Sequence, residues 1–502
     1  MEIFMIQVIT DVNSYINNLV WGWPALILLG FTGILMTCLT KFFQIGHFGH
    51  WIKNTIGAIM GDRDVTKHTK DKSITQFQSL CTALAATVGT GNIVGVAGAI
   101  AIGGPGAVFW MWLIAFFGMM TNFSENVLGI LYRRKNSEGE WCGGAMYYLK
   151  DGLGSRRGCK QIGVILAVLF SCFCLLASFG IGNMSQVNSM VSNINTAFGI
   201  PNIVTGIILV IAVGAVVVGG LKRIASFTEK LVPFMVIAYL VGTLIIIGMH
   251  IQSIPAVFVS IFKGAFAMKS AAGGVVGAGI MMAMKMGMKR GVFSNEAGLG
   301  SSVMVHSNSN VKEPVRQGMW GIFEVFADTI IVCTLTALTI LSSGAVDLTT
   351  GQLSAEAEAV GSNSLMSYAF SQTFGKPGAW FIALAILLFA YSTVLGWSHY
   401  GSKACEYLFG TKSIMVYRVV FVAIVLAGSV VEAQLAWDIS DTFNGLMMIP
   451  NLIGVLVLSK EVMKCTQNYV DRKIFKKDVK PILSVFPDIQ AEHEKAVREG
   501  AE

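Results

Sequence analysis

Long apolar segments separated by short polar ones dominate the chain from Trp23 almost to Ser459. Many of them run for about 20 residues without a charge, the length that an α-helix needs to cross the hydrocarbon core of a bilayer. They lack the alternation of polar and apolar residues that marks the strands of a membrane barrel. Because backbone groups in lipid must be satisfied within the segment, we expect helices, and hence an all-α, polytopic membrane protein.

The pattern predicts eleven transmembrane helices. Their expected ranges are Pro24–Thr40, Gln76–Gly103, Gly106–Tyr132, Gln161–Asn195, Asn202–Gly219, Ser226–Met249, Ser253–Arg290 (interrupted), Gly318–Leu341, Gly378–His399, Ser413–Val430 and Thr442–Leu458. No Lys or Arg precedes Lys41, so the first segment lacks the basic region of a signal peptide. We therefore expect it to be a retained helix.

Basic residues gather in every second connection between these segments. Lys and Arg crowd residues 41–72 and 133–160, whereas the turn Gly103–Pro105 between them along the chain has none. Because cytoplasmic loops carry the excess of basic residues, the crowded connections are predicted to be cytoplasmic. The N-terminus is then outside and the C-terminus cytoplasmic, in a multi-pass protein of the cell membrane (plasma or inner).

Composition narrows the class of protein further. Charged residues make up 13% of the 502 and hydrophobic residues 54%, with a mean hydropathy of +0.65, whereas soluble domains carry roughly 25% charge. The net charge of +7 comes from residues beside helix ends, so membrane lipid is an expected partner and nucleic acid is not. The nine cysteines are dispersed and predict neither a metal cluster nor a disulfide framework.

The motifs of several function classes are absent from the sequence. It has no P-loop pattern for ATP-driven transport, and neither His306 nor His399 stands in a His-Glu-x-x-His motif, so we expect no enzyme and no cofactor. An ion channel, which would call for repeated pore loops or rings of charge, is the less favoured alternative. Secondary transport of a small polar solute is the function that the pattern favours.

Two predicted helices carry glycine clusters at mid-membrane depth. In the second, Gly89, Gly91 and Gly95 surround Asn92, and in the seventh the cluster is 271–277. Glycine weakens a helix and favours a break. Paired Gly-interrupted segments in corresponding halves are typical of transporters built from inverted repeats, with the binding site at the breaks.

The breaks divide the chain into expected units: 1–75, an extra N-terminal helix and cytoplasmic loop; 76–250, the first repeat; 251–460, the second repeat; and 461–502, a cytoplasmic tail. Free N–H groups at a break suit a carboxylate, and free carbonyls suit a hard cation such as sodium, so an amino acid zwitterion with a co-transported ion fits both. The alternative is close helix packing, which the spacings Gly91/Gly95 and Gly273/Gly277 permit.

Four longer motifs carry a resemblance to a known family. They are Thr87-Val-Gly-Thr-Gly-Asn-Ile-Val-Gly95, Gly103-Gly-Pro-Gly106, Gly180-Ile-Gly-Asn-Met-Ser-Gln186 and Gly287-Met-Lys-Arg-Gly-Val-Phe-Ser-Asn-Glu-Ala-Gly-Leu-Gly-Ser301. With them the chain resembles, over nearly its whole length, the alanine or glycine:cation symporter family of the amino acid–polyamine–organocation superfamily. The resemblance implies a leucine-transporter-like core of 5+5 inverted repeats preceded by one extra helix. It also implies sodium-coupled import of small neutral amino acids (alanine, glycine) by alternating access.

The resemblance further implies site residues. The amides of Thr90 and Gly91 would hold the substrate carboxylate, and the carbonyls of Ala85 and Val88 would face a sodium ion. Further substrate contacts are expected from Asn92, Phe179, Asn183, Gln186, Gly273 and Gly274. For the side chains among these, the alternatives are interhelical hydrogen bonds and aromatic packing, while Asn92 could instead coordinate a second ion.

Span nine is expected to complete the ion site. Phe389 offers a carbonyl, and the hydroxyls of Ser392 and Thr393, three and four residues on, share its helix face. Oxygen donors of this kind suit a hard cation. Tyr391 and Trp397 are expected to be packing or interfacial aromatics, with a gating role as the alternative.

Charged residues near the spans are expected to snorkel or to form ion pairs at the inner gate. They are Glu125, Lys285, Glu324 and Asp328, all predicted within about two turns of a cytoplasmic helix end. The segment 294–300 is predicted at the inner (cytoplasmic) end of its span, where its glycines would allow bending as the inner gate opens; a capped helix start is the alternative. Lys230 could replace sodium in a proton-coupled transporter, but its place near the inner end favours snorkelling.

The basic stretch Lys473–Lys480 is predicted to be a solvated tail near anionic lipid.

Overall fold

The chain folds almost entirely into helices. The computed structural model describes residues 2–67, 73–266, 278–430 and 433–498. Its longer helices are α1 (Glu2–Val20), α2 (Trp23–Leu39), α7 (Gln76–Thr87), α9 (Gly106–Leu131), α11 (Lys160–Phe179), α12 (Ser185–Phe198), α13 (Asn202–Val217), α14 (Gly220–Met249), α15 (Ile254–Phe266), α16 (Ala278–Asn295), α18 (Pro314–Val325), α21 (Leu365–Phe374), α22 (Lys376–Phe409), α23 (Ser413–Gly428), α24 (Ala433–Val457), α25 (Ser459–Tyr469) and α26 (Pro487–Arg498).

Short elements connect or continue these helices. The short α-helices are α3 (Phe43–Gly46), α4 (Phe48–Asn54), α5 (Ile56–Gly61), α6 (Arg63–Thr66), α8 (Val96–Gly103), α10 (Ala145–Tyr147), α17 (Val303–His306), α19 (Thr334–Ser342) and α20 (Ala355–Val360). Five π-helical segments, two 3₁₀ turns and one antiparallel hairpin complete the described part of the chain. They are η1 (Gly91–Gly95), η2 (Tyr148–Leu153), η3 (Gly180–Met184), η5 (Phe326–Cys333), η7 (Val470–Ile474), η4 (Ile251–Ser253), η6 (Ser362–Ser364), β1 (Arg134–Lys135) and β2 (Trp141–Cys142).

Helices occupy most of the described part of the eleven predicted segments, with a break between Thr87 and Gly91 in the second. By length and apolarity, six helices of the described chain can cross a membrane, or up to eight if each bent pair counts as one span. The prediction of an all-α, polytopic membrane protein is confirmed at this level, while the number eleven stays a prediction. The first apolar segment begins earlier than expected, because α1 leads through Gly22 into α2, with Pro24 inside the first turn of α2.

Local sequence sets the ends of the helices that build the centre. Helix α7 begins with a reciprocal cap, in which the Thr75 hydroxyl accepts from Gln78 N–H and the Gln78 side chain accepts from Thr75 N–H. Helix α8 ends at Gly103 and is capped by Gly104, whose φ of 67° is left-handed, and Pro105 then precedes the first residue of α9, Gly106. The second and third predicted spans are therefore joined by a tight turn.

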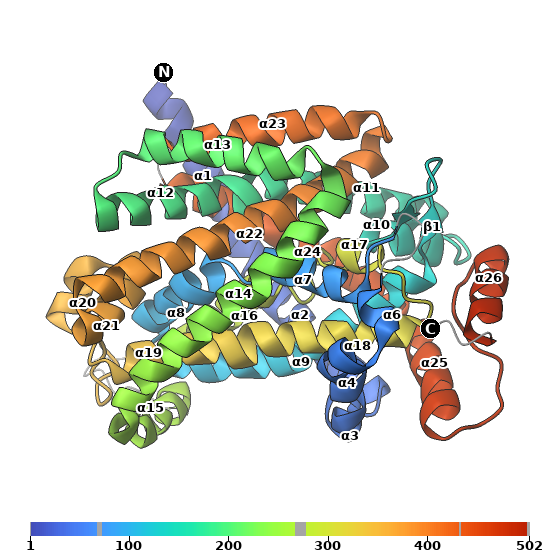
Figure 1. Cartoon of the computed structure of the whole chain (residues 1–502), viewed down its shortest axis with the longest axis horizontal. Coiled ribbons are helices and arrows are strands. Elements are labelled where there is room, and N and C mark those ends of the chain that lie inside the picture. Colours follow the sequence, from blue (N-terminus) through green and yellow to red (C-terminus); the bar gives the residue numbers. More distant parts are fainter. Residues whose placement is uncertain (1, 68–72, 267–277, 431–432, 499–502) are drawn as a thin grey trace.

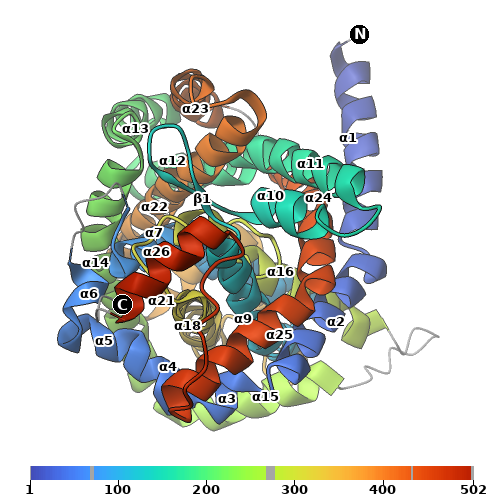
Figure 2. The same cartoon turned by 90° about the vertical axis from the view of Figure 1, so that its right-hand side faces the viewer.

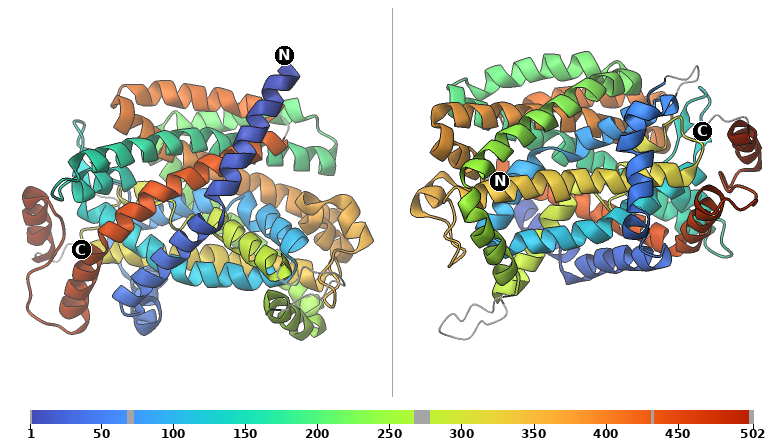
Figure 3. Two further views of the ribbon diagram at one scale, coloured as in Figure 1. Left: turned by 180° about the vertical axis from the view of Figure 1, so that it is seen from behind. Right: turned by 60° about the horizontal axis from the view of Figure 1, so that its bottom comes forward.

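The long helices run roughly along one axis of the molecule, with short elements at both ends (Figure 1). Helices α9 and α22 form the centre: α9 packs against α16, α18 and α2, and α22 against α7, α11 and α12. Helices α13, α14 and α23 lie on the periphery when the bundle is viewed along its axis (Figure 2). Helix α1 runs beside α24 on the back of the molecule (Figure 3).

The C-terminal segment is folded onto one end of the bundle and is not a free solvated tail. Arg472 forms two hydrogen bonds with the buried carboxylate of Glu313 at 2.7 and 2.9 Å, and Val485 N–H donates to Leu131 O at 3.1 Å. His493 of α26 is buried against Trp141. Burial, with Arg133 and other basic neighbours, lowers the pKa of His493 to about 2, so its imidazole is neutral. The basic stretch Lys473–Lys480 is itself mostly exposed, as predicted, and the docked residues lie on either side of it.

Candidate functional site

Helix α7 ends in the middle of the second predicted span. Val88 donates the last helical hydrogen bond, and the next N–H, that of Gly89, donates to Asn92 Oδ1 at 2.9 Å. Because this N–H would otherwise continue the helix by bonding to Ala85, the Ala85 carbonyl is released from the helical ladder. The chain then resumes as η1 and α8, bent by 50° from α7. The predicted break in this span is therefore present.

Helix α22 lies directly against this break. A Cβ on Gly89 would stand 2.3 Å from Thr393 Oγ1, so the two helices approach here only because residue 89 is glycine. The hydroxyls of Ser392 and Thr393 donate to Phe389 O at 2.8 and 3.1 Å. Each hydroxyl has thereby used its proton and keeps its lone pairs for a cation. The oxygen donors predicted on α7 and on α22 thus lie on elements in direct contact.

Gln186 of α12 joins the break from a third side. Its Oε1 accepts from Thr90 Oγ1 at 3.0 Å and, at the limit of a hydrogen bond, from Thr90 N at 3.5 Å. Its Nε2 donates to Ile181 O at 3.1 Å, which fixes the orientation of the amide. The Gln186 amide oxygen is therefore the present acceptor of the Thr90 N–H. The sequence analysis predicts the substrate carboxylate as the acceptor at this place.

Asn183 and Phe179, two other predicted substrate contacts, instead contact helix α23. Asn183 Nδ2 donates to Phe421 O of α23 at 2.7 Å, which is the interhelical hydrogen bond given above as its alternative. The ring of Phe179 packs on Tyr417 and Phe421, with centroids 5.4 and 6.3 Å apart. Phe179 thus joins the end of α11 to α23, and Asn183 joins η3 to α23. The remaining predicted contacts, Gly273 and Gly274, lie outside the described residues.

A buried carboxylate adjoins the break on its other side. Asp328 Oδ1 accepts from Asn92 Nδ2 at 2.6 Å, and Asp328 Oδ2 accepts from the hydroxyls of Ser294 and Thr329, both at 2.8 Å. All four side chains are fully buried. No Lys or Arg partner of Asp328 is found in the described part of the chain, so only neutral donors surround this oxygen-rich cluster.

The sequence analysis misplaced Asp328. It expected this residue near a cytoplasmic helix end, but α18, η5 and α19 form one helical run over Pro314–Ser342, and Asp328 lies half-way along it. Glu324, expected to snorkel or to form an ion pair at the inner gate, lies 3.0 Å from His306. Asp328, Glu324 and Glu125 are also fully buried, which rules out snorkelling in this conformation. The position of Asp328 within its apolar segment could have indicated a functional role, because a carboxylate in the middle of a membrane span is a functional candidate by default.

A second irregular segment faces the first one. Helix α16 ends at Asn295, and residues 296–302 are non-helical before α17 begins. A Cβ on Gly91 would stand 3.3 Å from the Phe293 ring and 3.4 Å from Ser294 Cα. The sequence analysis treated 294–300 as a hinge near the inner surface, whereas the structure sets its beginning directly against the α7 break.

Two buried carboxylates brace the segment 296–302. Glu296 accepts from Trp397 Nε1 at 2.8 Å and from Ser301 Oγ at 2.5 Å. Glu125 of α9 accepts from Gly300 N at 3.2 Å and from Asn451 Nδ2 of α24 at 2.5 Å. Trp397 is fully buried, as expected for a packing aromatic. Three long helices therefore fix the conformation of this segment.

Beyond these carboxylates a further polar network joins four elements. Glu324 Oε2 accepts from Asn122 Nδ2 at 3.1 Å and lies 3.0 Å from His306 Nε2. His306 Nδ1 in turn lies 3.2 Å from Ser79 Oγ and 2.5 Å from Gln317 Nε2. These groups come from α18, α9, α17 and α7, so the network ties the first half of the broken α7 to its neighbours.

An ion pair closes the opposite side of the breaks. Lys289 Nζ of α16 lies 2.5 Å from Asp441 Oδ2 of α24, and both side chains are largely buried. Trp21, between α1 and α2, donates its Nε1–H to Asp441 O at 2.9 Å, and Lys289 stands 5.5 Å from the Trp21 ring. Trp21 thus attaches the extra N-terminal segment to α16 and α24, the two helices that the Lys289–Asp441 ion pair joins.

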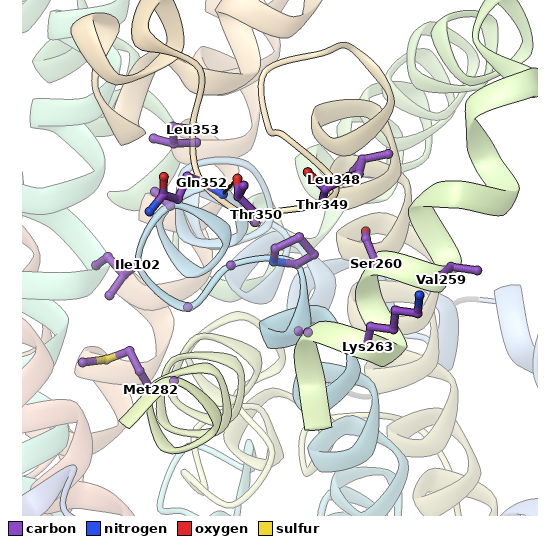
Figure 4. Close-up of a pocket in the computed structure, with 18 of the residues that line it drawn as sticks. Ile102, Val259, Ser260, Lys263, Met282, Leu348, Thr349, Thr350, Gln352 and Leu353 are labelled. Atoms are coloured by element: carbon purple, nitrogen blue, oxygen red, sulfur yellow. Dashed lines mark hydrogen bonds between the residues drawn. The ribbon is translucent and has the colours of Figure 1, made fainter. Parts of the chain in front are cut away.

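A surface cavity of about 1120 Å³ lies at the end of the bundle that carries α15 and α20 (Figure 4). It is lined by the turn 103–106, by α15 and α16, and by the loop 348–353, with Lys263 and Glu358 at its wall. None of the residues that form the two breaks lines it. The cavity is therefore separate from the site at the breaks.

A bundle of apolar helices with a bent span and a buried oxygen-rich site defines a polytopic membrane transporter. The model of the sodium:alanine symporter family matches residues 6–483. The chain belongs to this family, as its motifs indicated.

Several curated relatives cover almost the whole chain. It is 42% identical over 460 residues to the sodium/alanine symporter AgcS of Methanococcus maripaludis, covering 90% of this chain and 96% of that protein. It is 36% identical to the probable sodium/glutamine symporter GlnT of Bacillus subtilis, with 95% of each chain covered. It is 35% identical to the putative sodium/proton-dependent alanine carrier YrbD of Bacillus subtilis, covering 92% and 93%.

Proposed function

We propose that the protein is a sodium-coupled symporter that imports small neutral amino acids, alanine and glycine above all. The observation that carries the proposal is the contact between the end of α7 and the Phe389–Thr393 face of α22, which joins free backbone groups to hydroxyl oxygens at mid-span. The name of the relative AgcS supports alanine and sodium, whereas that of GlnT gives glutamine. Alanine and glycine are the better fit because Gly91 leaves little room before Phe293.

Sodium binds between α7 and α22 in this proposal. Its ligands are the carbonyls of Ala85, Val88 and Phe389 and the hydroxyls of Ser392 and Thr393. These are neutral oxygen donors from two elements, the kind of ligand that hard monovalent cations favour. Because the ligands come from both sides of a helix contact, binding of the ion holds α7 against α22.

The substrate binds at the facing breaks. Its carboxylate receives the N–H groups of Thr90 and Gly91 and displaces the Gln186 amide oxygen from Thr90. The ammonium group or a second sodium ion is neutralised by Asp328, held by Asn92 and Ser294. A zwitterion and one or two cations would thereby match a site that combines free N–H groups with one buried carboxylate.

Alternating access follows from the same arrangement. In the proposed orientation, with the N-terminus outside and the C-terminus cytoplasmic, α7 and α17 lie on the inner side of the breaks and α8 and α16 on the outer side. Helices in 76–250 and 251–460 would form the two inverted repeats. The Lys289–Asp441 pair then closes the outer side, and the His306–Glu324 network closes the inner side.

Proton coupling is the second candidate. The name of the relative YrbD includes protons, and His306 with Glu324 forms a fully buried titratable pair at the inner half of the site. Lys230, in contrast, is exposed on the outer surface of α14 and does not reach the ion ligands. Proton coupling in this protein would therefore not use Lys230 as a replacement for the sodium ion.

Uptake into proteoliposomes tests the function directly. We expect labelled alanine to accumulate against its gradient when sodium is high outside, and the uptake to saturate with alanine. Potassium in place of sodium should abolish accumulation, because it is too large for the same oxygen cage. Uptake that needs a pH gradient and ignores sodium would favour the second candidate, and sodium flux without alanine would indicate a channel.

Asp328→Asn tests the role of the buried carboxylate. Asparagine keeps an oxygen and the size of the side chain but removes the charge, so we expect the sodium concentration for half-maximal alanine uptake to rise about tenfold. Asp62→Asn, which removes a carboxylate paired with Arg316 at the end of the bundle, should leave it unchanged. Unaltered sodium dependence in the Asp328 variant would limit this residue to a structural role.

A further inference from the structure

A groove on the surface of α14 plays no part in the transport site. It has a volume of about 760 Å³ and is lined by the first turns of α14 together with Gly219. Its lining side chains form one stripe along the helix, from Lys222 to Phe234, at the spacings of a single helical face. Helices α13 and α14 lie at the periphery of the bundle (Figure 2). Lys222, Phe227 and Phe234 of the stripe are exposed.

The groove is basic where α14 begins. Lys222 and Arg223 line its first turn, and Lys230 lines it two turns further along, between Phe227 and Leu231. All three are exposed, and none of the residues that line the groove is acidic. The single carboxylate of α14, Glu229, is turned away and accepts from Gln78 Nε2 at 2.9 Å. The three positive charges therefore have no counter-charge among the residues that line the groove. An anion is the complementary occupant.

The groove becomes apolar further along α14. Phe227, Leu231 and Phe234 line it there, and the rings of Phe227 and Phe234 are 38% and 65% exposed. In the proposed orientation the basic end lies at the cytoplasmic surface and the aromatic end inside the hydrocarbon. This order, phosphate at the interface and acyl chain below it, is that of an anionic phospholipid.

The opposite face of α14 holds the first half of the broken span. Thr228 Oγ1 lies 3.0 Å from Thr82 Oγ1 of α7, one turn from the Glu229–Gln78 hydrogen bond. Phe227 also contacts the ring of Tyr391, at 5.8 Å between centroids, and Tyr391 directly precedes Ser392 on α22. An occupant of the groove therefore contacts the helix that positions both sides of the proposed sodium site.

We propose that this groove binds one anionic phospholipid, with its phosphate on Lys222, Arg223 and Lys230 and an acyl chain along Phe227 and Phe234. The bound lipid holds α14 in place against α7. The binding itself is independent of what the protein transports, whereas its effect on uptake rests on the proposed sodium symport.

Native mass spectrometry of the full-length protein tests the binding. The probe is phosphatidylglycerol, with phosphatidylcholine of the same acyl chains as the neutral reference. We expect the wild type to retain one phosphatidylglycerol, and Lys222→Gln/Arg223→Gln/Lys230→Gln to bind it about 100-fold more weakly, at roughly fivefold per basic residue. The control Lys53→Gln/Arg157→Gln/Lys160→Gln removes the same charge from exposed positions elsewhere and should bind like the wild type.

Each other outcome overturns the proposal. Equal retention by the groove variant and the wild type places the lipid elsewhere. Equal loss in both triple variants shows that overall charge, and not the groove, holds the lipid, and equal retention of phosphatidylcholine removes the requirement for an anion. A groove variant that loses a dimer mass instead of a lipid identifies a second copy as the occupant. If the triple variant fails to insert, Lys230→Gln alone, with Lys230→Arg as rescue, replaces it.

Alanine uptake in vesicles of phosphatidylcholine with and without about one quarter phosphatidylglycerol tests the effect on transport. We expect the anionic lipid to raise uptake several-fold in the wild type and in the control, and not in the groove variant. Stimulation of the groove variant to the same extent would contradict the link to α7. A wild type without sodium-stimulated uptake in either lipid would instead contradict the proposed function and leave the binding result intact.

Discussion

Gly91→Val is expected to lower alanine binding at least about 100-fold, because it changes the backbone position where the two breaks face each other. Even a Cβ at residue 91 would stand 3.3 Å from the Phe293 ring and 3.4 Å from Ser294 Cα, and valine adds two methyl groups beyond it. The larger side chain fills the proposed substrate space and pushes the breaks apart, and displacements of about 1 Å cost about this much. Equilibrium binding of labelled alanine to purified protein measures the effect.

Gly98→Val is the matched control on the same span. Gly98 belongs to α8, and a Cβ there would meet no atom within 4 Å, so the same substitution changes helix propensity without filling the site. We expect near-normal binding. Both variants should elute as folded protein, because neither substitution adds a charge to a span. Normal affinity in Gly91→Val would mean that this glycine serves helix packing and that the substrate binds elsewhere.

The fold class and the position of the first break could be predicted because each depends on local sequence. Apolar runs of sufficient length require helices in lipid, and the cluster at Gly89 and Gly91 interrupts α7 where the sequence indicates. The N–H of Gly89 finds its partner three residues away, in Asn92. Interactions of such short range are visible in a single sequence.

The facing irregular segment was harder to locate because two glycine-containing stretches compete for the role. The stretch 271–277 resembles the first break in composition and lies outside the described residues. The irregular segment 296–302 follows closely on Phe293 and Ser294, the residues of α16 that lie near Gly91. The backbone of this segment needs left-handed conformations at Glu296, Gly298 and Gly300, with φ of 56°, 94° and 73°. Two of these positions are glycine, so the sequence did contain a signal, although Glu296 at a left-handed φ gave none.

The role of Asp328 depends on contacts between distant parts of the chain. It reaches Asn92 across 236 positions of sequence and Ser294 across 34. No helical period or motif relates three residues on three helices, so only the tertiary fold brings them together. The same reason explains Asn183, whose amide was expected at the substrate but donates to the backbone of α23.

Replacing both Ser392 and Thr393 by alanine should raise the sodium concentration for half-maximal alanine uptake about 30-fold. These hydroxyls are the only side-chain ligands proposed for the ion between α7 and α22, and each loss costs about 1 kcal/mol. The three carbonyl ligands remain, so coordination weakens without vanishing. Because sodium and alanine binding are reciprocally coupled, excess sodium should restore the affinity for alanine.

Ser398→Ala/Ser402→Ala separates loss of the ion from loss of helix stability. Both serines are buried on the same helix, α22, and donate to backbone carbonyls at 2.6 and 2.7 Å, as Ser392 and Thr393 do. This control removes the same kind of hydrogen bond further along α22 and should keep the wild-type sodium dependence. A shift shared by both double variants would therefore reflect weakening of α22. A Ser392/Thr393 variant with unchanged sodium dependence would place the ion away from α22, and rescue by excess sodium in that variant alone is the result that a ligand role requires.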